Sequence, residues 1–311
     1  MKPKVIFMGT PDFATAALEA LLQLNLEVVA VVSQPDKPVG RHKQLRMTPV
    51  KSLALKYNIP VLQPVKIKES VDEILSFHPD LIITCAYGQM LPRPLLDVPQ
   101  FGCINIHASL LPKYRGGAPI HASVMAGDTQ TGVTLMKTVM KMDAGPYFAQ
   151  EMCPISIFDT TETVHDRLME VAKKAILTHL PAVWEKRAEF IEQDESKVTY
   201  AFNIQPKDEV IRFDQQGEAI YNQIRGLSSW PGAYMIVDGK KFKIYKLRYE
   251  PKEHSYTKVT FTNLVDDAFV MAVPGGFLHL LEVQLEGKKR QSAAEFYRGI
   301  GRTWEKKEID V

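Results

Sequence analysis

Two short apolar runs with a helix between them open the chain, and this arrangement constrains the fold more than any other feature. "KVIFMG" is the first apolar run and ends at Gly9, and "LEVVAVVSQ" is the second. Between them, "TPDFATAALEALLQLN" has helical spacing, with Thr10 expected as N-cap and Pro11 at the first helical position. A strand–helix–strand unit of this kind predicts a parallel sheet.

The turn after the first run argues against a dinucleotide-binding protein. Only Gly9 stands where the G-x-G-x-x-G fingerprint would place further glycines. The turn therefore favours an ordinary helix start after a buried strand. A nicotinamide-dependent enzyme remains an alternative only at the level of the fold.

Further segments continue the alternation of helix and strand. We expect helices in "PVKSLALKYN", "ESVDEILSF" and "TETVHDRLMEVAKKAILTHLPAVWEK". We expect strands in "DLIITCA", "FGCINIHAS", "TGVTLMKTV" and "GPYFAQEMCPI". Residues 1–189 are thus predicted to form a mostly parallel α/β domain.

The sequence changes in character after residue 189. Residues 190–207 are mostly polar and aperiodic, so we expect a linker there. From residue 208 to 311, one helix in "EAIYNQIRGLS" is followed by short alternating strands, and "VDGKK" carries an Asp-Gly hairpin signal. A small β-barrel is the predicted fold of this second domain.

Composition excludes several classes of protein. The 311 residues carry a formal net charge of only +2, so any basic surface must be local. The three cysteines, Cys85, Cys103 and Cys153, suit no zinc spacing and indicate reduced thiols in a cytoplasmic protein. The apolar run before Gly9 is too short for a signal peptide, and no stretch has the length of a membrane span.

The segment "CINIHASLLPKYRGGAPI" holds the most informative group of side chains. Asn105 and His107 are two residues apart on a strand, so both project from one face near the strand's end. Open parallel sheets bind ligands there, although a satisfied polar pair in the core would have the same spacing. The Leu-Leu-Pro edge and the turn with Gly116 and Gly117 favour a site for a flat heterocyclic ligand.

Asp143, in "KTVMKMDAGPYFAQ", is the candidate third member of this group. By itself, Asp-Ala-Gly-Pro is an ordinary turn. Together with Asn105 and His107, an aspartate completes a catalytic set. The amide can donate a hydrogen bond to a developing oxyanion, and the carboxylate can orient the imidazole and favour its charged form.

These motifs together carry a family resemblance. "INIHASLLPKYRGGAPI" and "MDAGP" closely resemble the formyltransferase family that uses 10-formyltetrahydrofolate. "MGTPDFATAALEAL", "SQPDKPVGRHKQLRMTPVK" and "EGKKRQSAAEFYRG" resemble the branch of that family that formylates methionine on charged initiator tRNA. The resemblance covers nearly the whole chain. It implies a Rossmann-like formyltransferase domain joined to an OB-like β-barrel.

The resemblance also implies roles for particular residues. Asn105, His107 and Asp143 match the family's catalytic residues. The segment expected to contact the folate consists of Ser109, Leu110, Leu111 and Pro112. The implied reaction moves a formyl group from 10-formyltetrahydrofolate to the α-amine of methionine on tRNA, and it requires no metal ion.

Two basic segments are candidates for tRNA contact. Residues 33–51 would otherwise be a solvated surface loop, but the resemblance implies an insertion that contacts the acceptor end, with Arg41 as its foremost contact. In "KKFKIYKLR", strand alternation puts Lys241 and Lys243 on one face, although such charge runs are usually just solvated. The predicted tRNA-binding residues are Lys37, Arg41, Lys43, Arg46, Lys241 and Lys243.

Alternative functions remain open at this point. A formyltransferase acting on a small amine would share the catalytic set but would not need the basic loop or the barrel. A hydrolase would release formate from the folate without an acceptor. A tRNA-binding module with an inactive catalytic domain would not need the intact Asn–His–Asp set. We expect a monomer with no membrane partner.

Overall fold

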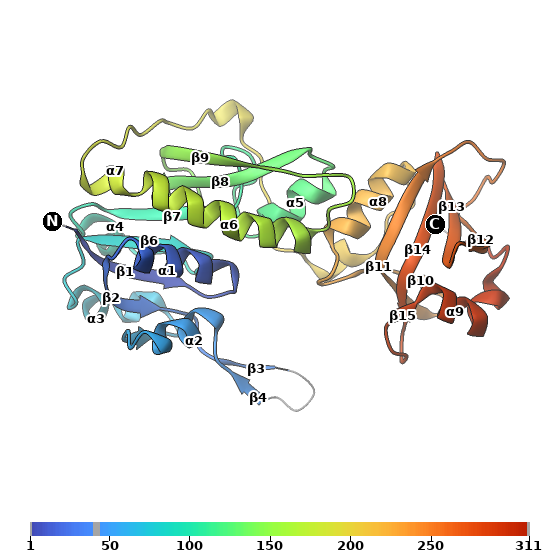
Figure 1. The fold of residues 1–311 in the computed structure, drawn as a ribbon, viewed down its shortest axis with the longest axis horizontal. Coiled ribbons are helices and arrows are strands. Elements are labelled where there is room, and N and C mark those ends of the chain that lie inside the picture. Colours follow the sequence, from blue (N-terminus) through green and yellow to red (C-terminus); the bar gives the residue numbers. More distant parts are fainter. Residues whose placement is uncertain (1, 40–43, 310–311) are drawn as a thin grey trace. The chain divides into compact units, whose positions relative to one another are not determined.

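The computed structural model describes residues 2–39 and 44–309, and the chain divides into two compact units (Figure 1). Unit 1 comprises Met1–Pro119, Gln130–Pro154 and His165–Phe202. Unit 2 comprises Ile120–Thr129, Ile155–Val164 and Asn203–Val311. Both units are therefore assembled from separate segments, and the last passage from unit 1 to unit 2 falls inside the predicted linker.

A seven-stranded sheet forms the centre of unit 1, in the order β5-β2-β1-β6-β7-β8-β9. The strands from β5 to β7 in that order pair in parallel, whereas β8 and β9 are antiparallel to their neighbours. The prediction of a mostly parallel α/β sheet is confirmed. The strands are β1 (Lys4–Gly9), β2 (Glu27–Val32), β5 (Val61–Leu62), β6 (Leu81–Cys85), β7 (Cys103–His107), β8 (Gln130–Lys137) and β9 (Tyr147–Pro154), with a separate ribbon of β3 (Lys37–Val39) and β4 (Gln44–Arg46).

The first helix begins two residues later than the sequence predicts. Helix α1 starts at Phe13 after the N-cap Asp12, so the prediction of Thr10 as N-cap was wrong. The Thr10 hydroxyl instead donates to the Tyr87 carbonyl at 3.2 Å and accepts from the Gln34 amide at 3.3 Å. The Thr10 hydroxyl therefore links the loop after β6 to the loop after β2 by hydrogen bonds. Helix α1 packs on β1, β2 and β6.

The long helix predicted over residues 161–186 is two helices in the structure. Helix α6 ends at His179, and the short helix α7 begins at Pro181. Proline lacks the amide hydrogen that would continue the helix, and it suits the first position of a new one. The helices associated with unit 1 are α1 (Phe13–Gln23), α2 (Pro49–Lys56), η1 (Ile67–Glu69), α3 (Val71–Leu75), α4 (Arg93–Asp97), α6 (Thr161–His179, shared through Val164 with unit 2), α7 (Pro181–Trp184) and η2 (Glu195–Lys197).

Unit 2 is built on an antiparallel sheet in the order β10-β11-β14-β13-β12, with β15 paired to β14. The prediction of a second, smaller β domain is confirmed, and its sheet is antiparallel. Among the described strands no pairing of β10 with β12 closes the sheet, so the predicted barrel stays a prediction. The strands of unit 2 are β10 (Ala233–Val237), β11 (Lys240–Pro251), β12 (Thr260–Val265), β13 (Ala268–Val273), β14 (Gly276–Leu285) and β15 (Gln291–Ser292). Its helices are α5 (Pro119–Met125, shared at its first residue with unit 1), η3 (Pro206–Glu209), α8 (Gly217–Gly226), α9 (Ala293–Gly299) and η4 (Gly301–Trp304).

Helix α9 was not predicted, although the sequence carries a signal for it. Ser292 accepts from the Glu295 amide and the Glu295 carboxylate accepts from the Ser292 amide, each at 3.2 Å. This reciprocal pair is a capping box, and S-x-x-E is its sequence signature. "SAAE" at residues 292–295 matches the signature.

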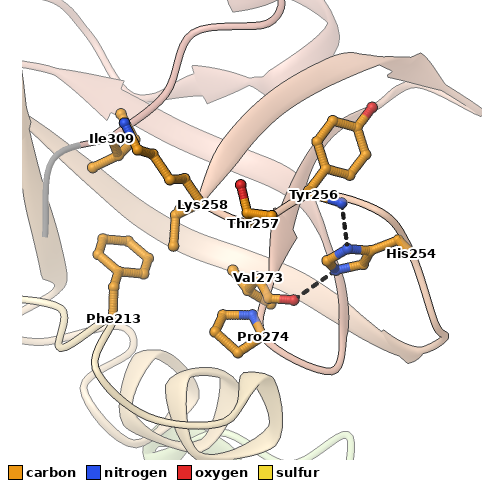
Figure 2. Close-up of a pocket in the computed structure, with 9 residues that line it drawn as sticks. Phe213, His254, Tyr256, Thr257, Lys258, Val273, Pro274 and Ile309 are labelled. Atoms are coloured by element: carbon orange, nitrogen blue, oxygen red, sulfur yellow. Dashed lines mark hydrogen bonds between the residues drawn. The ribbon is translucent and has the colours of Figure 1, made fainter.

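A cavity of about 410 Å³ lies in unit 2 beside His254 and Tyr256 (Figure 2). The ring nitrogens of His254 are engaged by the chain itself, since Nε2 contacts the Val273 carbonyl at 2.8 Å and Nδ1 accepts from the Tyr256 amide at 3.2 Å. The hydrogen-bonding capacity of the imidazole is therefore already used inside unit 2.

Burial explains why the strands of unit 1 read as continuous apolar runs. Val5, Ile6, Phe7 and Met8 of β1 are all 0% exposed, as expected for a parallel strand covered on both faces. In the part of the chain that the structure describes, no helix is both long enough and apolar enough to cross a membrane. Strands β1, β6 and β7 end side by side, at Gly9, Cys85 and His107.

Candidate active site

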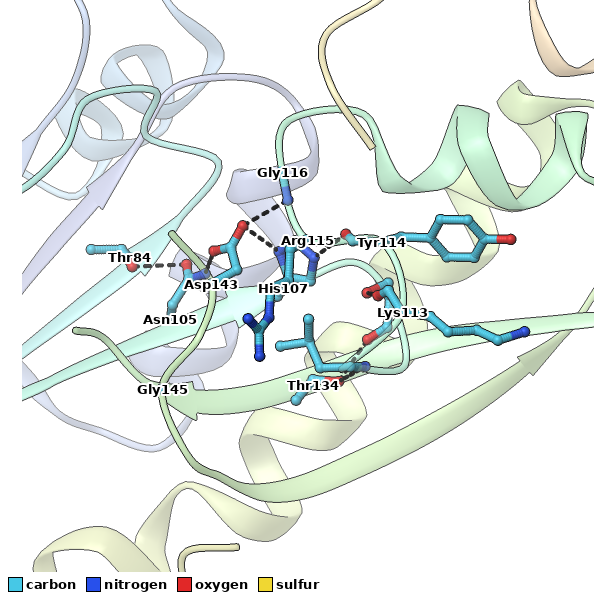
Figure 3. A network of polar contacts seen from close by, with 12 residues as sticks. Thr84, Asn105, His107, Lys113, Tyr114, Arg115, Gly116, Thr134, Asp143 and Gly145 are labelled. Carbon is cyan, nitrogen blue, oxygen red and sulfur yellow. Dashed lines mark hydrogen bonds and ion pairs between the residues drawn. The ribbon is translucent and has the colours of Figure 1, made fainter. Parts of the chain in front are cut away.

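Strand β7 carries Asn105 and His107 to the carboxyl edge of the parallel sheet (Figure 3). The register pairs Asn105 with Thr84 of β6, and the Thr84 hydroxyl donates to Asn105 Oδ1 at 2.8 Å. Because the amide oxygen is engaged by Thr84, the Nδ2 group is left to donate. It faces Asp143 Oδ1 at 3.4 Å.

The imidazole of His107 has one nitrogen fixed and one nitrogen facing a carboxylate. Nε2 lies 2.9 Å from the Tyr114 carbonyl oxygen, which can only accept, so Nε2 carries the hydrogen. Nδ1 lies 3.8 Å from Asp143 Oδ2, longer than a hydrogen bond. The side chain is only 6% exposed. Nδ1 is therefore the ring nitrogen that faces the Asp143 carboxylate.

Asp143 reaches this pair from the loop between β8 and β9. The Gly116 amide donates to Asp143 Oδ2 at 2.9 Å. Gly116 has φ +124°, and a Cβ there would lie 2.5 Å from the Ala201 carbonyl oxygen, so the close approach requires glycine. The structure thus brings Asn105, His107 and Asp143 together, while their catalytic roles stay predictions.

The side chains of Thr134 and Gln150 hold the main chain of the predicted folate segment by hydrogen bonds. The Thr134 hydroxyl donates to the Ser109 carbonyl at 2.6 Å, and Gln150 Nε2 donates to the Leu111 carbonyl at 2.8 Å. Ser109 is fully buried, and its hydroxyl donates to the Lys113 carbonyl at 2.6 Å. Leu110 and Pro112 are half-buried. Of the four residues, these two are the ones that present side chains at the surface.

The predicted tRNA-binding residues of the N-terminal segment are only partly described. Lys37 of β3 and Arg46 of β4 are exposed and lie directly opposite each other. Arg41 and Lys43 lie outside the described residues. Lys51, at the end of the same segment, is paired with Asp36 at 2.6 Å.

In unit 2, Lys241 and Lys243 project from the outer face of β11, as strand alternation predicts. The residues between and after them, Phe242 and Ile244, are 0% exposed. The Lys241 ammonium lies 4.4 Å from the centre of the Tyr234 ring, and Lys243 Nζ donates to the Pro231 carbonyl at 2.7 Å. Lys243 is therefore partly engaged by the chain, whereas Lys241 remains exposed.

Four supporting contacts were not predicted from the sequence. Thr84 and the Gly116 amide touch the catalytic candidates directly, and Arg115 and Gln193 hold the loop that carries Asp143. No spacing pattern links Gln193 to Asp143, because they are 50 residues apart. Only the register of β6 against β7 could have indicated Thr84.

The three cysteines are buried, which argues against a reactive thiol. Burial raises the pKa of the Cys103 thiol to about 12 and raises that of Cys85 as well, so neither suits a nucleophile. Among residues 2–39 and 44–309, no cluster of three or more metal-ligating side chains was found. A second cavity, of about 540 Å³, is lined partly by Lys137, Thr138 and Met140, at the start of the loop that carries Asp143.

Solved structures share this fold at low sequence identity. A sugar 3N-formyl transferase crystallised with dTDP and 5-N-formyl-THF has a TM-score of 0.68 and 20% identity, covering 93% of this chain and 100% of its own. An N-formyltransferase from Helicobacter canadensis, in complex with folinic acid and dTDP-3-aminofucose, has a TM-score of 0.67 and 18% identity, covering 90% and 99%. These two likenesses support the fold.

Sequence comparison is more specific. The family model described as formyl transferase matches residues 1–180, and the one described as formyl transferase, C-terminal domain, matches residues 203–301. The methionyl-tRNA formyltransferase of Geobacillus sp. (strain WCH70) is 46% identical over 301 residues, 96% of this chain and 95% of the relative. That of Malacoplasma penetrans is 44% identical over 296 residues, 95% of this chain and 93% of the relative. The chain therefore belongs to the formyl transferase family, and within it to the methionyl-tRNA formyltransferases.

Proposed function

We propose that this chain transfers the formyl group of 10-formyltetrahydrofolate to the α-amino group of methionine on charged initiator tRNA. The observation that carries the proposal is the convergence of an amide donor, an imidazole and a carboxylate at the carboxyl edge of the sheet. Membership of the family supports the same reaction. The folate is a co-substrate, and the tRNA is the acceptor.

The chemistry is an acyl transfer between two nitrogens. The neutral amine attacks the formyl carbon and forms a C–N bond, giving a tetrahedral intermediate with an oxyanion. The bond from that carbon to folate N10 then breaks. The amine loses one proton and N10 gains one, so the protons balance. Asn105 Nδ2 has two N–H groups: one donates to Asp143 Oδ1 at 3.4 Å, and the other is the proposed donor to the oxyanion.

His107 has a role at one particular atom. Because the Nε2 hydrogen is held by the Tyr114 carbonyl, Nδ1 is the atom that can carry a proton toward the reacting groups. A protonated imidazole there would stabilise the oxyanion. Asp143 would orient the ring and stabilise its positive charge, and the Gly116 amide keeps the carboxylate turned toward it.

The folate would lie along the segment that follows β7. Leu110 and Pro112 offer an apolar edge for a flat heterocycle. Ser109 and Leu111 act differently in this proposal, because their polar groups are already bonded to Lys113, Thr134 and Gln150. Ser109 and Leu111 fix the conformation of the segment, and Leu110 and Pro112 contact the folate.

The tRNA would contact the basic groups of both units. Lys37 and Arg46 are like charges placed opposite each other on one ribbon, which is unfavourable unless an anion lies nearby. Arg41 and Lys43 belong to the same basic segment. On unit 2, exposed Lys241 beside Tyr234 is a stronger candidate than Lys243. Because charged tRNA is a translation substrate, we place the reaction in the cytoplasm, and we propose a monomer.

The test is transfer of radiolabelled formyl from 10-formyltetrahydrofolate to charged initiator tRNA. Uncharged initiator tRNA lacks the methionyl amine and serves as the matched control, and a small-molecule amine is offered in a parallel reaction. We expect label only on the charged tRNA. Label on the small amine would overturn the acceptor but keep the folate chemistry, and free formate without any labelled acceptor would indicate a hydrolase. Size-exclusion chromatography would test the monomer.

A further inference from the structure

The loop that carries Asp143 holds an unfavourable main-chain conformation. Asp143 has φ +47°, which a residue with a Cβ adopts at a cost unless its surroundings stabilise it. Gly145 packs so closely that a Cβ there would lie 1.8 Å from the Lys137 carbonyl oxygen. The carboxylate faces Asn105 and His107 from this main-chain geometry. Whatever holds the loop therefore also sets the direction of the carboxylate.

The Gln193 side chain binds the main chain of the loop that carries Asp143. Its Nε2 donates to the carbonyl oxygens of Asp143, at 2.8 Å, and Gly145, at 2.7 Å. Gln193 is 8% exposed and belongs to the segment predicted as a linker. Two hydrogen bonds from one amide therefore bracket the turn on both sides of Ala144.

Arg115 determines which way the Gln193 amide points. Its Nε and one terminal nitrogen donate to Gln193 Oε1 at 3.0 and 2.8 Å. A guanidinium has only donors, so the amide oxygen must face it, and the NH2 group must face the loop. Arg115 is fully buried, and Glu195 supplies the opposite charge at 2.8 Å.

The contacts close into a ring. Gly116, the residue after Arg115, donates its amide hydrogen to Asp143 Oδ2, while Arg115 holds Gln193 and Gln193 holds the Asp143 carbonyl. The turn at Arg115 and Gly116 thus holds the Asp143 carboxylate directly and holds the Asp143 main chain through Gln193. A shift of either contact would move the other.

We propose that Gln193, oriented by Arg115, is a positioning residue that keeps the Asp143 carboxylate directed at His107. This inference rests on the proposed function, because it assumes that Asp143 serves the reaction. A purely structural network would stabilise the chain without acting through Asp143. The two differ in kinetics, so the inference can be tested.

Gln193→Glu is the sharpest single change. It keeps an oxygen for Arg115 but replaces the two N–H donors with an acceptor facing two carbonyl oxygens. We expect kcat to fall by about 10- to 100-fold, as small misplacements of a reacting group do, with KM for both substrates nearly unchanged. An unchanged kcat would overturn the proposal.

Gln223→Glu is the matched control. Gln223 in unit 2 is similarly buried, with Nε2 donating to the Asp208 and Val210 carbonyls and Oε1 accepting from the Arg212 amide. This change removes the same kind of bonds far along the chain from Asp143. We expect a lower melting temperature with kcat unchanged. If both variants lost kcat equally, the role of Gln193 would be structural and the proposal would be wrong.

A double-variant cycle separates this inference from the function on which it rests. If Gln193 acts through Asp143, then Gln193→Glu combined with Asp143→Asn should be no slower than Asp143→Asn alone. If the double variant lost kcat by the product of the two single losses, the inference would be overturned and the proposed function would still stand. Wild-type kcat in Asp143→Asn alone would instead overturn the catalytic role of Asp143. If Gln193→Glu does not fold, Gln193→Asn keeps the amide on a shorter side chain, and the same cycle applies with the same two outcomes.

Discussion

Single hydrogen bonds define the chemistry that each side chain at the site can perform. The Thr84 hydroxyl donates to the oxygen of the Asn105 amide, so that Nδ2 faces Asp143 and donates to its Oδ1 at 3.4 Å. The Tyr114 carbonyl takes the Nε2 hydrogen of His107, which leaves Nδ1 to face Asp143. Neither partner is reactive itself, yet each determines the role of the residue it binds.

Removing the Asn105 amide should slow the reaction strongly while the folate still binds. The loss of one oxyanion donor costs on the order of 10²–10³ in kcat, and we expect this for Asn105→Ala in single-turnover formyl transfer. His107→Ala should also lower kcat severely. Asn203→Ala, at an exposed position, is the control and should leave kcat unchanged. A near-normal kcat in Asn105→Ala would mean that another group stabilises the oxyanion.

Thr84→Val should act on the reaction through Asn105. Valine keeps the shape of threonine but removes the hydroxyl, so the Asn105 amide loses the donor that fixes its orientation. We expect kcat to fall by roughly tenfold, equivalent to about 1.4 kcal/mol. Thr84→Ser restores the hydroxyl and should recover most of the rate. A kcat in Thr84→Val close to that of the parent would show that this hydrogen bond does not determine how Asn105 acts.

Paired strands bring residues together that are distant in the sequence. The parallel register of β6 and β7 sets Thr84 beside Asn105, and the antiparallel ribbon of β3 and β4 sets Lys37 opposite Arg46. The short helix η2 (Glu195–Lys197) places Glu195 against the buried Arg115. Each of these pairs forms because a strand or helix is aligned with another segment, and each can be tested by removing its charge or its hydrogen bond.

If the β3–β4 ribbon contacts phosphates, Arg46→Gln should reduce the salt dependence of tRNA binding. Each lost phosphate contact lowers the slope of log affinity against log salt by about 0.7–0.9. The measurement is KM for charged tRNA at several salt concentrations, and KM for the folate should not change. Lys68→Gln, an exposed lysine elsewhere in unit 1, is the control. An identical slope in Arg46→Gln and the parent would exclude Arg46 from the phosphate contacts.

Glu195 should stabilise the folded chain near neutral pH and lose this contribution in strong acid. Hydrogen bonds from Arg115 and Lys141 lower the pKa of Glu195 from its ordinary 4.5 to about 2 in the folded chain. Its contribution is therefore complete above pH 4.5 and is lost as the pH falls toward about 2. In denaturant titrations, Glu195→Gln should lose less unfolding free energy over this window than the parent does. Parallel pH profiles for the two proteins would contradict this.

The whole chain is two units with two kinds of core. Unit 1 buries parallel strands on both faces, and unit 2 gathers large aromatic rings between its sheet and helix α9. Phe242 of β11 lies 5.0 Å from Phe296 and 5.1 Å from Trp304, measured between ring centroids. The aromatic cluster is therefore a large share of what holds unit 2 together.

Phe242→Ala should destabilise unit 2 by about 3–5 kcal/mol, because it leaves a cavity among the aromatic rings. Denaturant unfolding followed by tryptophan fluorescence measures the change, since Trp304 is in the same cluster. Phe158→Ala is the control, because Phe158 is 81% exposed and its loss should cost little. A difference below about 1 kcal/mol between the two variants would show that the cluster is not a principal support of unit 2.

Local sequence patterns were enough to predict most of the elements and two of the three side chains of the candidate site. Apolar runs and helical spacing predicted the mostly parallel sheet, and strand alternation placed Asn105 and His107 on one face. The resemblance identified Asp143. The errors were also local: Thr10 joins two loops and does not cap α1, Pro181 divides one predicted helix, and the capping box of α9 was overlooked.

The supports of the site could be found only in the folded chain, because they are made between segments with no common pattern. Gln193 reaches Asp143 across 50 residues, and Arg115 reaches Gln193 across 78. A hydrogen bond forms or fails with a difference of a few tenths of an ångström in the distance between such groups, and spacing along a sequence carries no information about that distance. Periodicity can therefore predict which face a side chain occupies, whereas packing between distant segments sets the direction in which its donor points.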